Sequence, residues 1–123
     1  MNTLLWIVQI LLALVFAAAG LVKLSQSKEQ LRTKMAWVDA VPAGAVKALG
    51  AVEVLAAIGL ILPALTGIAP VLTPLAAVGL VVVMIGAIVV HARVREYPAI
   101  GANVVLLLLA ALVAWGRFGP YAF

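Results

Sequence analysis

Four long apolar segments decide what this chain can fold into. Each contains 17 to 20 residues, and they cover residues 4–22, 44–62, 71–90 and 99–115. Because an α-helix rises about 1.5 Å per residue, roughly 20 apolar residues cross the hydrocarbon core of a bilayer, which is about 30 Å thick. The sequence therefore predicts an all-α integral membrane protein, a four-helix bundle in which each segment is a transmembrane helix.

The composition supports this interpretation and excludes several functions. Hydrophobic residues make up 67% and charged residues 10% of the 123 positions, against roughly 45–50% and about 25% in soluble domains. We expect a single transmembrane domain, 1–123, with no room for a soluble catalytic domain. The chain has no cysteine and one histidine, so by itself it lacks the ligands for iron–sulfur clusters and for the common zinc sites. We expect no metal site, no intrinsic cofactor and no enzyme activity of the chain alone.

The positions of the basic residues indicate how the chain crosses the membrane. Seven of the eight lie in or beside the first and third connections: Lys23, Lys28, Arg32, Lys34 and Lys47 in or beside residues 23–43, and Arg93 and Arg95 in the third. Only Arg117 lies beyond the last segment. Because cytoplasmic loops are enriched in Lys and Arg, we expect these two connections in the cytoplasm and both termini outside, in the periplasm or extracellular space. The basic charge thus indicates how the chain is oriented in its partner, the lipid bilayer. It argues against a nucleic-acid partner.

The first connection also contains a helix signature. The stretch "SKEQLRTKMAWV" begins with Ser27 and has Gln30 three residues later, which is a capping box, and apolar residues follow at helical spacing. We predict a short interfacial helix on the cytoplasmic leaflet that ends before Pro42. The alternative is a solvated loop whose lysines only set the topology.

Small residues at steps of three and four along each apolar segment predict which helix faces meet. Transmembrane helices pack closely where Gly and Ala line the interface. The rare polar residues Gln9, Glu53 and Asn103 lie on these same faces. We therefore expect all three side chains inside the bundle, with the broad Leu and Val faces toward lipid.

Glu53 is the central polar residue of the predicted bundle. At 1.5 Å per residue it lies about 13 Å from the cytoplasmic end of its helix, near the midplane. An ionised carboxylate there costs at least ~2.5 kcal/mol, so we expect a neutral Glu53 unless a cation or water reaches it. Three roles follow: a proton-coupling site, a hydrogen-bond partner for a buried ligand such as a quinone ring oxygen, or a tether to Asn103 or Gln9.

Lys23 and His91 lie at the predicted cytoplasmic boundary. Lys23 is the obvious cationic partner of Glu53, but the distance favours a side chain that extends to the lipid headgroups. His91 ends the third segment, where it would be an interfacial anchor or a proton-entry group. With Glu53, Asn103 and Gln9, these two residues complete the candidates for ligand binding or proton coupling, and no catalytic residue is identified.

Four stretches in order resemble the DoxX-like family of small bacterial four-helix membrane proteins. They are "GLVK" (20–23), "GAVEVLAAIGLILP" (50–63), "MIGAIVVHAR" (84–93) and "AWGRFGP" (114–120). Lys23, Glu53 and His91 match polar positions of the family pattern. The resemblance implies a multi-pass protein of the bacterial inner membrane. Because the family takes its name from membrane subunits of an archaeal thiosulfate:quinone oxidoreductase, it also implies a quinone-linked role or an oxidoreductase partner.

Two functional hypotheses follow, beside a purely structural role as a packing unit of a larger complex. The first is a non-catalytic membrane subunit or binding scaffold for a redox partner or for a lipid-soluble ligand, such as a quinone or a lipid. The alternative is a small proton-coupled transporter that works as a homo-oligomer with Glu53 as its coupling site. Small multidrug transporters also have four helices and one membrane glutamate, but theirs lies in the first helix, where this chain offers only Gln9.

Overall fold

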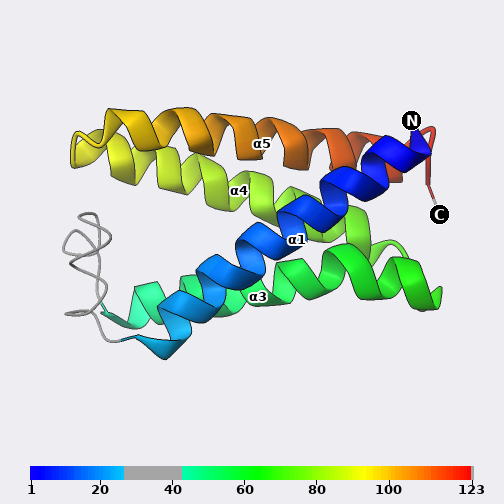
Figure 1. Cartoon of the computed structure of the whole chain (residues 1–123), viewed down its shortest axis with the longest axis horizontal. Helices are drawn as coiled ribbons and strands as arrows, with labels where there is room; N and C mark the ends of the chain where they lie inside the picture. The colour runs from blue at the N-terminus through cyan, green and yellow to red at the C-terminus, as the bar shows by residue number, and fades with distance from the viewer. Residues whose placement is uncertain (27–42, 123) are drawn as a thin grey trace.

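Four helices form the part of the chain that the computed structural model describes, residues 1–26 and 43–122 (Figure 1). They are α1 (Asn2–Ser25), α3 (Ala43–Thr66), α4 (Leu72–Arg93) and α5 (Tyr97–Phe118). All four are long and apolar enough to cross a membrane. The prediction of an all-α transmembrane four-helix bundle is therefore confirmed. The short helix predicted within residues 27–42 lies outside the described residues.

The largest difference from the predicted boundaries is at the end of α3, which continues through Pro63 to Thr66. Proline has no N–H, so the carbonyl of Gly59, four residues earlier, loses its usual helical hydrogen bond. The buried hydroxyl of Thr73 on α4 donates to this carbonyl over 2.9 Å. A neighbouring helix thus satisfies the freed backbone group, as transmembrane helices that contain proline require.

The helices are arranged as two close pairs. α1 packs mainly against α3, and α4 packs mainly against α5. In Figure 1, α1 crosses the bundle obliquely and meets the end of α5 where the two termini lie. At the opposite end, called the basic end because Lys47, Arg93 and Arg95 lie there, α1 lies beside α3 and away from α5. The two pairs therefore diverge toward the basic end.

The close contact of α1 with α3 depends on two glycines. A Cβ atom added to Gly20 would lie 2.6 Å from the carbonyl oxygen of Gly50 and 2.6 Å from a methyl group of Val54. A Cβ atom on Gly50 would lie 2.8 Å from Cβ of Lys23. Only glycine permits backbones to approach this closely. The expected packing through small residues is thus found at this crossing.

The core and the lipid-facing surface separate along each helix. Phe16, Leu60 and Leu80 are at most 2% exposed, whereas Leu14 and Leu55 are 65% and 67% exposed. In a soluble protein such exposed leucines would be unusual in this number, but hydrocarbon solvates them well. The outer surface is therefore suited to contact with lipid.

Candidate functional site

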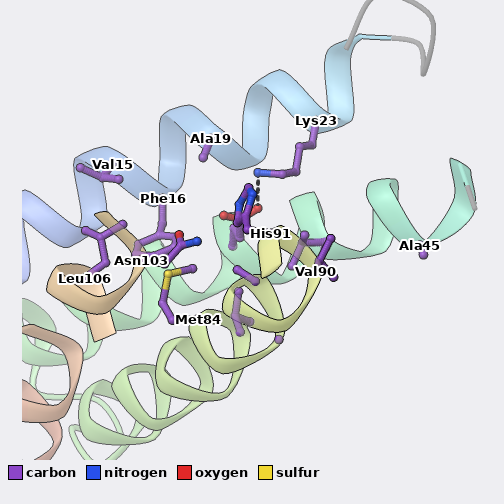
Figure 2. A pocket seen from close by; sticks show the side chains of 15 residues that line it. Val15, Phe16, Ala19, Lys23, Ala45, Met84, Val90, His91, Asn103 and Leu106 are labelled. Carbon is purple, nitrogen blue, oxygen red and sulfur yellow. Dashed lines mark ion pairs between the residues drawn. The ribbon is translucent and has the colours of Figure 1, made fainter. Parts of the chain in front are cut away.

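A cavity of about 430 Å³ lies among the four helices. Its walls are mainly apolar and include Phe16, Met84 and Leu106. Each helix adds one polar side chain to the lining: Lys23 from α1, Glu53 from α3, His91 from α4 and Asn103 from α5. Figure 2 labels Lys23, His91 and Asn103 around the cavity. The volume falls within the range of roughly 300–1,000 Å³ that is typical of small-molecule sites.

Lys23 and Glu53 form a buried ion pair on the cavity wall. Nζ of Lys23 lies 2.9 Å from Oε1 of Glu53, and the two side chains are only 7% and 4% exposed. The expectation that Lys23 extends to the headgroups is therefore wrong. Gly20 lies one helical turn before Lys23, and Gly50 lies one turn before Glu53. Because these two glycines bring α1 and α3 close together, the lysine can reach the carboxylate.

Lys47 holds the end of α1 that carries Lys23. Its Nζ donates hydrogen bonds to the carbonyl oxygens of Lys23 (2.8 Å), Leu24 (2.9 Å) and Gln26. The last carbonyls of a helix have no partner within the helix, and a cation there also interacts favourably with the helix dipole. Lys47 was interpreted from the sequence only as a topology charge, but in the structure it positions the ion pair.

Asn103, which lines the cavity, carries a buried hydrogen-bond donor without a partner. The residue is 9% exposed, and its Nδ2 makes no hydrogen bond within the described part of the chain. A buried donor in this state costs about 1–3 kcal/mol. The tether hypothesis required Asn103 or Gln9 to bond Glu53, and the structure places neither of them against its carboxylate.

His91 lies at the edge of the same cavity. Its Nδ1 is 3.2 Å from Oε1 of Glu96, which belongs to the turn between α4 and α5. The imidazole side chain is 14% exposed and the Glu96 side chain 31%. His91 therefore connects the cavity wall to a partly exposed carboxylate, a position compatible with both roles predicted for it.

Gln9 is buried as expected but belongs to a separate cluster near the termini. Its Nε2 donates to the carbonyl oxygen of Leu60 (2.8 Å), and its Oε1 accepts from Nε of Arg117 (2.7 Å). Arg117 also donates from Nη1 to Oδ1 of Asn2 (2.6 Å) and to the carbonyl oxygen of Tyr121 (2.9 Å). Gln9 thus links α1, α3 and α5 at the end of the bundle opposite the cavity residues Lys23 and His91.

Arg117 is the residue that sequence reasoning missed. It was interpreted as a charge beyond the last helix, but it is 3% exposed and lies inside α5. A signal was available, because Asn103, Ala110 and Arg117 follow one another at steps of seven residues. Such steps keep side chains on one helix face, and all three are buried.

The described residues contain no group of three or more His, Cys, Asp or Glu side chains that could hold a metal ion. The cavity instead combines apolar walls with one ion pair, one free amide donor and one imidazole. Such a lining can hold an apolar molecule and orient its polar head by hydrogen bonds.

Four membrane-spanning helices around a largely apolar cavity with a buried ion pair define a small multi-pass membrane protein with an internal site. The chain belongs to the DoxX-like family, whose sequence pattern matches residues 7–113. This confirms the resemblance seen in the sequence, and the matched range includes all the cavity residues. Neither a curated protein nor a solved structure matches the chain.

Proposed function

We propose that this protein is a membrane-embedded binding scaffold that holds a lipid-soluble ligand, such as a quinone or a lipid, in the cavity among its helices. The observation that carries the proposal is the buried, unpartnered Nδ2 of Asn103, a residue that lines an apolar cavity of about 430 Å³. A ligand oxygen that accepts from this amide would remove the cost of the buried donor.

The rest of the lining fits the same kind of ligand. Phe16, Met84 and Leu106 offer contacts for an apolar body, and methionine and aromatic side chains adapt well to such molecules. Lys23 and Glu53 supply a donor and an acceptor beside it. The chain would bind and orient the ligand, while any electron transfer would fall to an oxidoreductase partner in the membrane, because the chain has no cysteine and one histidine.

Replacement of Asn103 by Leu tests this function. We expect the bound fraction of ligand to fall about ten-fold, the effect of losing one hydrogen bond of about 1.4 kcal/mol. The thermal unfolding midpoint should not fall, because Nδ2 has no protein partner to lose. The measurement is native mass spectrometry of protein released from mild detergent, with the unfolding midpoint taken from circular dichroism.

The matched control is Val104→Leu on the neighbouring position of α5, which is 40% exposed and should retain the ligand. Equal retention by the Asn103→Leu variant would contradict the proposed site. Wild-type protein that carries neither quinone nor lipid would contradict the proposed function.

We also propose that the basic end faces the cytoplasm and both termini face outward, across a bacterial inner membrane. The support is the gathering of Lys47, Arg93 and Arg95 at that end. Because the chain has no cysteine, single cysteines at Ile68 (74% exposed) and Tyr97 (61% exposed) report each end without removing a basic charge. We expect an impermeant maleimide added to intact cells to label the cysteine at Ile68 only. Labelling of only the cysteine at Tyr97 would show that the protein has the opposite orientation.

A further inference from the structure

The chemical class of the ligand follows from the charges of the cavity, if the proposed function holds. One ammonium, on Lys23, faces one carboxylate, on Glu53, so the pair is neutral in sum. A ligand that brought a net charge into this apolar cavity would leave that charge uncompensated inside the membrane, where isolated charges are costly. The ligand therefore enters in a neutral form.

The ion pair offers a neutral ligand more than a hydrogen bond, because its carboxylate can be exchanged. An acid with an ionisable O–H can transfer its proton to Glu53. The O–H bond of the ligand breaks, an O–H bond forms on the Glu53 carboxyl, and the oxyanion of the ligand takes the place of Glu53 beside Lys23. The total charge stays the same, and the ammonium keeps an anionic partner throughout.

The acidity of the ligand decides whether this exchange is favourable. A carboxylic acid and a glutamic acid are the same functional group, so proton transfer between them is nearly balanced. A phenol is a much weaker acid than a carboxylic acid, so it would resist the transfer strongly. Proton exchange thus selects carboxylic acids among lipid-soluble molecules.

We propose that the cavity binds a lipid-soluble carboxylic acid, with Lys23 as the cation that faces the ligand carboxylate, Glu53 as the acceptor of its proton and Asn103 Nδ2 as a donor to its second oxygen. All three side chains line the same cavity. Phe16 and Met84 then contact the hydrocarbon chain of the acid. Figure 2 shows the ion pair beside His91. It also shows Asn103 next to Phe16 and Met84.

The test compares dodecanoic acid with methyl dodecanoate, in which a methyl group replaces the acidic hydrogen, on the full chain in lipid nanodiscs. Equilibrium dialysis of radiolabelled probes gives their dissociation constants. We expect the acid to bind at least ten-fold more tightly than the ester, which keeps the carbonyl for Asn103 but has no proton to transfer. Equal affinities would overturn the proposal without any variant being needed.

Two variants assign the roles. Lys23→Met should weaken binding of the acid at least ten-fold and leave the ester unaffected, because the carboxylate loses its cation. Glu53→Gln removes the proton acceptor, so the acid can bind only as its anion beside Lys23, and its affinity should no longer fall as the pH rises, as it does in the wild type. The matched control, Arg93→Met at an exposed position outside the cavity, should change neither affinity.

The same assay separates this inference from the proposed function. If the ester or a quinone binds in the cavity with no preference for the acid, the scaffold function stands and the inference fails. If none of the three probes binds, both fail. An acid affinity that depends on pH in Glu53→Gln just as it does in the wild type would also contradict the exchange, because Glu53 would then not be the group that takes up the proton.

Discussion

Replacing Lys23 with Met should destabilise the protein by about 3–5 kcal/mol. The substitution keeps the length of the side chain but leaves Glu53 in the wall of an apolar cavity without its cation. Removing one partner of a buried ion pair is costly because the remaining charge is not compensated. The free energy of unfolding, measured by reversible denaturation in mild detergent, reports this loss directly.

A double variant shows whether the loss comes from the stranded charge. Lys23→Met combined with Glu53→Leu removes both charges, and neutral replacement of a buried pair is often tolerated. We therefore expect the double variant to be more stable than Lys23→Met alone. If the effects of the two substitutions on the unfolding free energy were additive, the double variant would be less stable. Arg93→Met, which removes an exposed cation of the same end, serves as the control. A Lys23→Met variant as stable as this control would mean that Lys23 lies at the headgroups, as the sequence first suggested.

The sequence predicts the helices and their polar faces because both are local properties. Hydropathy alone marks four spans, and helical spacing brings Gln9, Glu53 and Asn103 inside, where the structure buries all three. What the sequence does not give is which of these residues meet. Glu53 pairs with Lys23 and Gln9 with Arg117, because partners depend on where helices cross and on the angle between them.

The step of seven residues would have improved the prediction. Gln9, Phe16 and Lys23 follow at this interval on α1, and all are at most 6% exposed. A helix face that repeats every seven residues is typical of helices packed at small crossing angles. By this criterion Lys23 belongs to the interior face rather than to the headgroup boundary. The criterion works for membrane helices because the small and polar residues, not the apolar ones, mark the packed face.

The ion pair also shows how packing and chemistry are coupled in this bundle. Lys47 fixes the end of α1, and the glycine crossing fixes the distance from α1 to α3. Lys23 is one turn beyond Gly20, and Glu53 is one turn beyond Gly50. The Lys23–Glu53 pair is therefore positioned by an apolar contact between two glycines together with the hydrogen bonds of Lys47.

Gly20→Ala should consequently weaken both the fold and the site. Its methyl group would lie 2.6 Å from the backbone oxygen of Gly50 and 2.6 Å from a methyl of Val54. The backbone oxygen cannot move aside by a change of rotamer, so α1 and α3 must separate. Overpacking of this kind costs about 1–3 kcal/mol, and we expect the unfolding free energy to fall by that amount together with the retention of ligand.

Gly79→Ala is the matched control, because a Cβ atom at Gly79 would meet nothing within 4 Å. Alanine favours a helix over glycine by about 0.5–1 kcal/mol, so this variant should be neutral or slightly more stable. Adding Val54→Ala to Gly20→Ala removes one of the two close contacts but not the one with Gly50. We therefore expect partial rescue of stability. If Gly20→Ala were as well tolerated as Gly79→Ala, α1 and α3 could not cross at these glycines, and the distance between Lys23 and Glu53 would lose its structural cause.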